Sequence, residues 1–212
     1  YYQRSLGEVA LPSIPKKIRH LGKLALKRAL KSLDEKNRKF LSEREEKPQL
    51  HQAQQNAVSA IMHSCGFAPY VLYGVTGSGK TEIYLHSIEQ VLDRSPDAQI
   101  LVMVPEINLT PQLETSVCNR FPHENIATLH SRLTESERLK NWLKIASGKA
   151  RIILGTRLAV LAPAPKLALI IVDEEHDPSY KQQEGLRYSA RDLAVWRACQ
   201  LKIPVVLGSA TP

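Results

Sequence analysis

The sequence predicts an α/β fold in which a mostly parallel β-sheet carries helices on both faces. Short runs of continuous apolar residues, such as 100–104 and 167–172, are typical of strands buried on both sides. These runs alternate with longer amphipathic segments, an order that produces parallel strands joined by right-handed crossovers. A chain of 212 residues suits one domain, or one domain with an appendage.

Six strands and five helices are expected after Pro48. We expect the strands at 70–73, 100–104, 126–129, 151–154, 167–172 and 205–207. We expect the helices at about 52–64, 80–94, 110–120, 134–147 and 189–200. Trp142 and Trp196 fall within two of these amphipathic helices, so both are expected in the core. Ligands of such sheets bind beyond the carboxyl ends of the strands, and we therefore expect the site at that edge.

The composition excludes several classes of protein. Hydrophobic residues at 43% and charged residues at 24% exclude a disordered or fibrous chain. The longest strongly apolar run, 167–172, is too short to span a membrane, and no signal segment opens the chain. Three widely spaced cysteines (Cys65, Cys118 and Cys199) fit neither a disulfide framework nor a zinc site. We expect a cytoplasmic protein without a membrane partner, and the opening Tyr1 suggests that the sequence begins inside a longer chain.

The positive charge is concentrated in the first quarter of the chain. Residues 1–50 hold 13 Lys and Arg against 6 Asp and Glu, whereas residues 51–212 hold 16 against 15. Apolar residues at helical spacing predict a basic helix over 16–47, and Pro48 marks its boundary. We expect a basic segment over 1–48 and a folded domain over 49–212. Such a segment favours a polyanionic partner such as nucleic acid, but a solvated basic helix face explains the charge equally well.

A glycine-rich loop follows the first expected strand and opens a helix. Its sequence, GVTGSGKT over 74–81, fits the phosphate-loop pattern in its strand–loop–helix context. Backbone N–H groups of such a loop and the helix N-terminus surround phosphates, and the expected nucleotide-binding residues are Gly74, Thr76, Gly77, Ser78, Gly79, Lys80 and Thr81. Lys80 is expected to reach the β- and γ-phosphates, and the Thr81 hydroxyl to bind Mg²⁺. The alternative is a glycine-rich turn with an exposed lysine.

An acidic motif, DEEH over 173–176, stands at the carboxyl end of the apolar run 167–172. Asp173 occupies the position of the second Mg²⁺ ligand in a phosphate-loop ATPase. The neighbouring Glu174 is expected to take a proton from the attacking water. The alternative is an acidic turn after a core strand.

Together with GSAT over 208–211, these motifs resemble the first motor lobe of a superfamily 2 DEXH-box helicase. The segments GVTGSGKTE, VPEINLTPQL, DEEHDPSYKQQEGLRYSARDLAV and GSATP closely resemble the bacterial primosomal helicase family, PriA or primosomal protein N′. The match covers about residues 50–212, and residues 1–15 resemble the end of that family's N-terminal DNA-binding domain. The resemblance implies a RecA-like P-loop NTPase lobe preceded by a short basic helical segment.

The family resemblance also implies a function. It implies an ATP-dependent 3′-to-5′ DNA helicase of replication restart, which assembles a primosome at stalled forks. It implies ATP and Mg²⁺ as cofactors, with zinc confined to a later part of the family's proteins and none in this chain. The implied partners are single-stranded and forked DNA, other primosome proteins and single-strand-binding protein.

The resemblance assigns roles to single residues. Lys80, Thr81, Asp173 and Glu174 match the family's phosphate, Mg²⁺ and catalytic residues. His176 is similar to the residue that links the ATP site to DNA, through Ser209 and Thr211. Gln54 resembles the adenine-reading glutamine, with registers at Gln52 or Gln55, or an exposed helix glutamine, as alternatives.

Polar groups at other strand ends resemble the family's DNA contacts. We expect contacts from Thr110, from the turn His130, Ser131 and Arg132, and from the turn Thr156 and Arg157. Arg132 stands where the family commonly has glycine. The loop 178–191 mixes aromatic and cationic residues, and the expected contacts there are Tyr180, Lys181, Arg187, Tyr188 and Arg191. The alternatives are ordinary polar turns and half-buried core tyrosines.

Two other functions compete with a DNA-driven motor. A phosphate-loop small-molecule kinase needs a lid and an acceptor pocket, which the sequence does not reveal. A non-catalytic nucleotide- or DNA-binding module is the third reading, because one lobe alone cannot move along DNA. Intact Lys80, Asp173 and Glu174 argue against decay of the ATP site.

Overall fold

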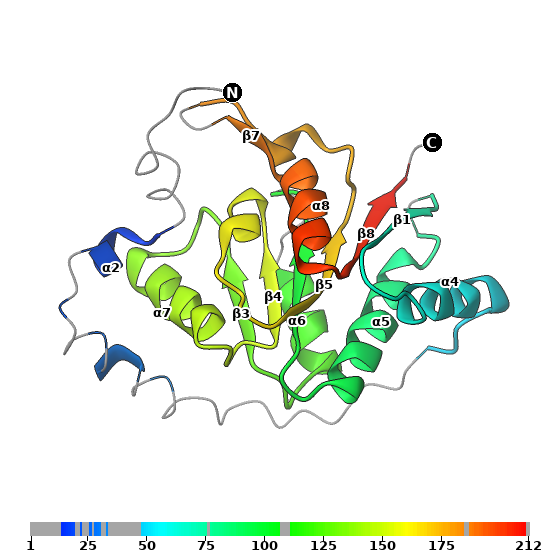
Figure 1. Ribbon diagram of the computed structural model, residues 1–212, viewed down its shortest axis with the longest axis horizontal. Coiled ribbons are helices and arrows are strands. Elements are labelled where there is room, and N and C mark those ends of the chain that lie inside the picture. Colours follow the sequence, from blue (N-terminus) through cyan, green and yellow to red (C-terminus); the bar gives the residue numbers. More distant parts are fainter. Residues whose placement is uncertain are drawn as a thin grey trace.

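The computed structural model of this chain describes residues 14–19, 22, 26, 28–30, 33, 48–75, 77–106, 111–184 and 187–210. Thr76, Thr110 and Thr211, and most of the helix expected over 16–47, lie outside the described residues. Within that segment the structure describes a short helix, α2 (Lys16–Arg19), which packs against a helix of the domain, α7 (Glu135–Ala146) (Figure 1).

Six parallel strands form the central sheet, as the sequence predicts. They are β1 (Ala68–Tyr73), β2 (Gln99–Met103), β3 (Ile126–Leu129), β4 (Ile152–Gly155), β5 (Leu167–Val172) and β8 (Pro204–Ser209). Their order across the sheet is β1-β8-β5-β2-β4-β3, with every pairing parallel. A separate antiparallel pair, β6 (Lys181–Gln182) and β7 (Tyr188–Ser189), was not expected.

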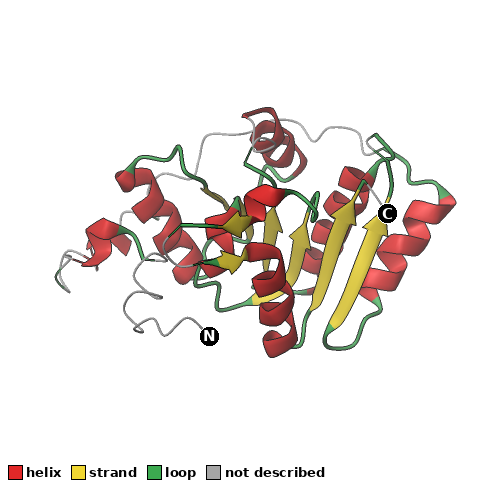
Figure 2. Cartoon of the chain, turned by 90° about the horizontal axis from the view of Figure 1, so that it is seen from above, coloured by secondary structure: helices red, strands yellow, loops and turns green. Residues whose placement is uncertain are grey.

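Helices cover both faces of the sheet, again as predicted (Figure 2). One face carries α4 (Gln52–Met62), α5 (Lys80–Arg94) and α6 (Pro111–Arg120). The other carries α7 and α8 (Ala190–Leu201), together with the 3₁₀ turn η2 (Arg157–Leu161). A second 3₁₀ turn, η3 (Pro178–Tyr180), follows β5.

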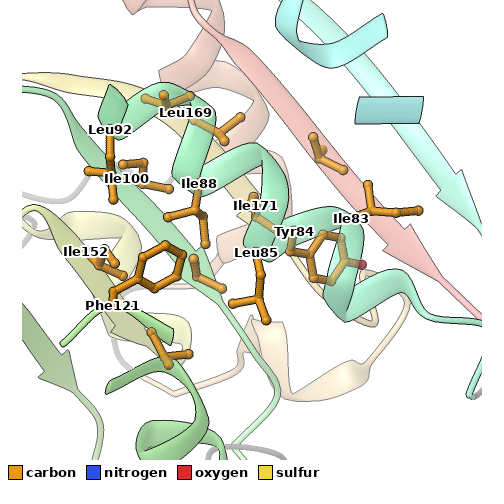
Figure 3. Packing of buried hydrophobic residues seen from close by; sticks show 14 of the residues in the cluster. Ile83, Tyr84, Leu85, Ile88, Leu92, Ile100, Phe121, Ile152, Leu169 and Ile171 are labelled. Carbon is orange, nitrogen blue, oxygen red and sulfur yellow. The ribbon is translucent and has the colours of Figure 1, made fainter. Parts of the chain in front are cut away.

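Side chains of β5 alternate between the two faces, which explains why its sequence is apolar throughout. Leu169 and Ile171 belong to the core under α5, with Ile88 and Ile100 (Figure 3). Ile170 and Val172 belong to the core under α8. Fully burying one such side chain contributes about 1.5–3 kcal/mol, so both faces of the strand stabilise the fold.

The core position expected for Trp196 is wrong. Its side chain is 59% exposed. Helix α8 instead packs through Ala190, Ala194 and Ala198, which recur every four residues and are fully buried. Trp196 falls off this stripe, whereas Trp142 on α7 is half-buried. Small residues at the interface let α8 lie close to the sheet. A helix pattern judged from large apolar residues does not reveal such an alanine face.

The crossover from β1 to β2 positions the site. Strands β8 and β5 lie between β1 and β2 in the sheet, so α5 passes across them. The first turns of α5 therefore stand near the carboxyl ends of β8 and β5. Among the described residues, no helix is long and apolar enough to cross a membrane.

Candidate functional site

Three motifs that are far apart in the sequence meet at one edge of the sheet. The phosphate loop follows β1, the DEEH motif follows β5, and Ser209 ends β8, which lies between them. The backbone N–H of Gly74 donates to the Ser209 carbonyl at 3.0 Å, and the N–H of Glu175 donates to the Gly208 carbonyl at 2.8 Å. Main-chain hydrogen bonds thus lock the three strand ends together.

The loop 74–79 has the backbone shape that phosphate binding requires. Gly77 and Gly79 have φ of 82° and 83°, values that L side chains rarely adopt. Gly79 is the N-cap of α5 and gives no side-chain cap, so first-turn N–H groups keep their hydrogen-bonding capacity. An anion at this helix N-terminus would satisfy those donors and interact favourably with the helix dipole.

Lys80 is buried at the base of this loop, with only 8% of its surface exposed. Its Nζ donates to the Gly74 carbonyl at 2.5 Å and lies 3.6 Å from Glu174 Oε1. The structure therefore brings together the lysine and the carboxylate motif that the sequence predicts. A buried ammonium needs such partners, or a phosphate in their place.

Tyr84 is a site residue that the sequence reasoning missed. Its hydroxyl donates to Asp173 Oδ1 at 2.9 Å (Figure 3 shows the buried ring on α5). A Cβ added at Gly208 would lie 1.8 Å from that hydroxyl and 3.0 Å from Asp173 Oδ1, so glycine leaves room for the contact. Burial raises the pKa of the Asp173 carboxyl, and the Tyr84 hydroxyl opposes that rise. A tyrosine one turn after a phosphate loop was the available signal.

Glu174 and His176 hold the DEEH turn in a strained, connected shape. Glu174 has φ of 45°, uncommon for a non-glycine residue and typical of functional sites. His176 Nε2 lies 3.7 Å from Glu174 Oε2, and its Nδ1 lies 3.4 Å from Ser209 Oγ. His176 therefore bridges the expected base and the GSAT strand, although Thr211 lies outside the described residues.

Among three candidate glutamines, Gln54 is the one next to the phosphate loop. It is 9% exposed, and its Nε2 donates to the Gly79 carbonyl at 3.4 Å. Its Oε1 accepts from the His51 backbone N–H at 3.0 Å in a capping box that starts α4. Gln52 and Gln55 are exposed and bond within or just before their own helix. The alternative of an exposed glutamine does not hold for Gln54.

Tyr180 does not offer a face for stacking bases, so the expected stacking role is wrong for this residue. Only 2% of Tyr180 is exposed, and its hydroxyl donates to the Asp173 carbonyl at 2.7 Å. Burial raises the pKa of its phenol. The alternative of a core tyrosine holds, because η3 folds the ring back under the DEEH turn. Tyr188 is half-buried in the same core.

Arg157 is engaged by the loop after the DEEH motif rather than extended into solvent. Its Nη1 donates to the carbonyls of Ser179 and Lys181 at 3.0 and 3.2 Å. The neighbouring Thr156 is buried, with 5% exposed. The structure thus gives these two residues packing and positioning contacts in place of the surface exposure that a phosphate contact needs.

Other expected DNA contacts do lie on the surface at this edge. Ser131 and Arg132 are exposed after β3, and Ser131 Oγ donates to Glu106. Lys181 and Arg187 are exposed on the loop. The remaining two are less available: Arg191 Nη1 pairs with Glu175 Oε2 at 3.0 Å, and the side chain of His130 is 13% exposed.

The residues at the three strand ends fit a magnesium–triphosphate group. Asp173 is a largely buried carboxylate whose Oδ1 is oriented by Tyr84, and Thr81 is exposed on the first turn of α5. Carboxylate and hydroxyl oxygens suit Mg²⁺, which usually takes few protein ligands beside phosphate oxygens. The glycine loop and the uncapped helix suit the phosphates.

Comparison with known proteins agrees with this geometry. A family model described as DEAD/DEAH box helicase matches residues 51–212. The chain is 50% identical over 163 residues to the replication restart protein PriA of Haemophilus influenzae, covering 77% of this chain and 22% of that protein. It is 50% identical over 143 residues to PriA of Bacillus subtilis, covering 68% and 17%. The chain spans less than a quarter of each relative.

Solved structures agree on the fold. RecG bound to a three-way DNA junction matches with a TM-score of 0.58 and 25% identity, over 86% of this chain and 23% of that chain. The UvsW helicase of bacteriophage T4 matches with a TM-score of 0.54 and 16% identity, over 91% and 61%. The expected RecA-like lobe is confirmed.

Proposed function

Since the chain belongs to the DEAD/DEAH box helicase family and is similar to replication restart proteins PriA, we propose that it is the first motor lobe of a replication-restart helicase. As part of that protein it drives ATP-dependent 3′-to-5′ unwinding of forked DNA, together with other primosome proteins and single-strand-binding protein. The observation that carries the proposal is the meeting of the phosphate loop, Asp173–Glu174 and His176–Ser209 at three adjacent strand ends.

The lobe binds ATP through the loop 74–81. Backbone N–H groups of the loop and of the first turn of α5 bind the phosphates, and Lys80 exchanges its contact with the Gly74 carbonyl for a phosphate oxygen. Gln54 reads the adenine once its amide releases His51 and Gly79. Thr81 and Asp173 would hold Mg²⁺, which would neutralise part of the phosphate charge.

Glu174 accepts the proton of the attacking water. Its contacts with Lys80 and His176 fix where its two oxygens point, so water approaches a carboxylate that is already oriented. Hydrolysis by the lobe alone is slow, because related motors take an arginine from a second lobe. Loss of such an arginine costs about 10³–10⁵ in rate in phosphate-loop enzymes.

Single-stranded DNA lies along the carboxyl edge of the sheet. The exposed residues that support this path are Ser131, Arg132, Lys181 and Arg187, and Thr110 adds a contact from the segment before α6. His176 and Ser209 connect this edge to Glu174, which couples DNA binding to hydrolysis.

The matched pair Glu174→Gln and Asp173→Asn tests the ATP site. Glu174→Gln is expected to bind a fluorescent ATP analogue with wild-type affinity while losing residual hydrolysis, because only the base is removed. Asp173→Asn is expected to weaken binding in Mg²⁺ but not in EDTA. Wild-type turnover by Glu174→Gln would refute the assignment of the base.

Stimulation of ATP turnover by single-stranded DNA, but not by small hydroxylated acceptors, distinguishes the motor from a kinase. The same measurement separates the motor from a non-catalytic module, which would show no turnover with either addition.

A further inference from the structure

A cavity of about 170 Å³ lies beside the carboxyl end of β3, apart from the ATP site. The helix α2 and its preceding residues form one wall, and α7 forms the opposite wall. On α7, Glu135, Arg138 and Trp142 face the cavity, since residues three and four apart share one face of a helix. His130 and Leu158 close the end nearest the sheet.

Two residues that line the cavity each hold a buried side-chain atom without a hydrogen-bond partner among the described residues. The two atoms are Nδ1 of His130 and Oε2 of Glu135. Burial lowers the pKa of His130, so its ring is neutral at neutral pH. A buried polar atom without a partner costs free energy, and native proteins rarely leave one unpaired. Both atoms accept hydrogen bonds, since Glu135 is a carboxylate and the N–H of His130 lies on Nε2, which faces Glu114 at 3.6 Å, so a ligand that turns either side chain into the cavity has to donate hydrogen bonds.

The remaining wall combines flat apolar surface with positive charge. Trp142 and Leu158 supply the apolar surface, and Lys16, Arg19 and Arg138 supply the charge. An apolar cavity of about 150 Å³ holds benzene, so this volume suits a single flat ring. A nucleotide combines such a ring, with hydrogen-bond donors on its edge, and an anion.

We propose that this cavity binds one unstacked nucleobase of a DNA single strand, with Trp142 beside the ring and Lys16, Arg19 and Arg138 near the flanking phosphates. The proposal rests on the single-strand binding proposed above. The occupant is a base of the strand rather than a free nucleotide, because the lining residue His130 directly precedes the exposed Ser131 and Arg132, on the edge along which the strand is proposed to lie. The cavity volume matches a pyrimidine best.

A single-tryptophan chain tests the proposal directly. The sequence has two tryptophans, and Trp196 is exposed on α8, so Trp196→Phe leaves Trp142 as the reporter. Unlabelled oligo-dT is expected to quench Trp142 emission with the same midpoint that anisotropy of a labelled strand reports. A strand of the same length made of abasic sites is expected to bind through its phosphates without quenching. Free dTMP is expected to quench only at far higher concentration.

A pair of substitutions on α7 tests the affinity. Trp142→Leu is expected to weaken oligo-dT binding at least about fivefold, the lower end of what one stacked base contributes, and to leave the abasic strand unaffected. Lys140→Ala removes an exposed charge from the same helix outside the cavity, and it is expected to change binding of both strands equally. Circular dichroism of both variants checks the fold.

Each possible result supports or overturns the proposed base site. Equal quenching by oligo-dT and the abasic strand, or none at saturation, overturns the base site while single-strand binding stands. Tighter quenching by dTMP than by oligo-dT assigns the cavity to a free nucleotide and overturns the proposal. Failure of every strand to bind in anisotropy overturns both this inference and the proposed DNA path.

Discussion

One hydroxyl, that of Tyr84, joins the helix after the phosphate loop to the carboxylate after β5. Asp173 offers two oxygens, and Tyr84 occupies Oδ1. A metal ligand that is also hydrogen-bonded is held in orientation, and loss of such a partner typically weakens metal binding by about 10- to 100-fold. Tyr84 is therefore a positioning residue for the proposed Mg²⁺ ligand.

Tyr84→Phe is expected to raise the Mg²⁺ concentration needed for nucleotide binding by about tenfold, because Asp173 loses its donor while the buried ring remains. The measurement is binding of a fluorescent nucleotide titrated with Mg²⁺, with thermal unfolding as a check on the fold. Tyr70→Phe is the matched control, since the Tyr70 hydroxyl donates to the Ala60 carbonyl at 2.8 Å away from the site. An unchanged Mg²⁺ midpoint in Tyr84→Phe contradicts the positioning role.

We expect His130 to make the stability of the fold depend on pH. Burial lowers its pKa below the ordinary value of 6.5, with Arg132 adding to the shift and Glu114 opposing it. The folded state therefore binds this proton less readily than the unfolded state, so stability is full above about pH 6.5 and is lost as the pH falls through the folded pKa. His130→Gln is expected to flatten the fall in melting temperature between pH 7.5 and 5.5. Parallel curves for both proteins would contradict the shift.

The sequence predicted the residues of the ATP site but not the residues that hold them in position. Lys80 and Glu174 lie 3.6 Å apart. This agrees with the expectation that both motifs lie at the carboxyl ends of parallel strands. Tyr180 was expected to contact DNA, with burial in the core as the alternative, and the structure buries it. Sequence alone does not decide this, because an aromatic side chain in a loop packs wherever the loop folds back. The position of Tyr84 one turn after the phosphate loop was the only signal for it, and a helix position that faces the core does not reveal which group its hydroxyl reaches.

At the scale of elements, long periodic segments were predicted and short irregular ones were not. The expected strands 126–129 and 167–172 and the expected helix 80–94 coincide with β3, β5 and α5. The pair β6–β7 and the turns η2 and η3 are two to five residues long, too short to show any period. They depend on tertiary contacts for their stability.

Arg157 supplies one such contact, and Arg157→Ala is expected to loosen the loop after the DEEH turn. The carbonyls of Ser179 and Lys181 lose a charged donor. The loss costs about 1–3 kcal/mol where the carbonyl is part-buried, as for Ser179. Hydrogen exchange of amides 179–182 is expected to accelerate, while exchange in α5 stays unchanged. Arg187→Ala is the control, because exposed Arg187 donates to the Gln183 carbonyl within the loop and, among the described residues, has no hydrogen bond to the DEEH turn. Equal exchange in both variants contradicts this role of Arg157.

At the scale of the whole molecule, the chain combines a nearly neutral lobe with a basic segment. The lobe from residue 51 onward holds 16 Lys and Arg against 15 Asp and Glu, and the residues before it hold 13 against 6. The proposed DNA affinity then has two components. Contacts of lysines with phosphates release counterions and weaken steeply with salt, whereas contacts with bases depend on salt far less.

We expect the salt dependence of single-strand binding to flatten, with residual binding left, when five lysines of the basic segment are exchanged for glutamine. These are Lys23, Lys27, Lys31, Lys36 and Lys39. Each lost phosphate contact lowers the slope of log affinity against log salt by about 0.7. The exchange spares α2, whose Lys17 Nζ donates to Ser136 Oγ, so the wall of the cavity is kept. Binding of a fluorescent strand between low and moderate salt measures the slope.

Lys202→Gln provides the control for this measurement. Lys202 is exposed at the end of α8 and precedes β8, so it lies at the edge opposite the strand ends. Its loss changes the net charge without removing a proposed phosphate contact, and the slope is expected to stay the same. If the five exchanges also leave the slope unchanged, the basic segment is a solvated helix face and the DNA affinity of the chain belongs to the lobe alone.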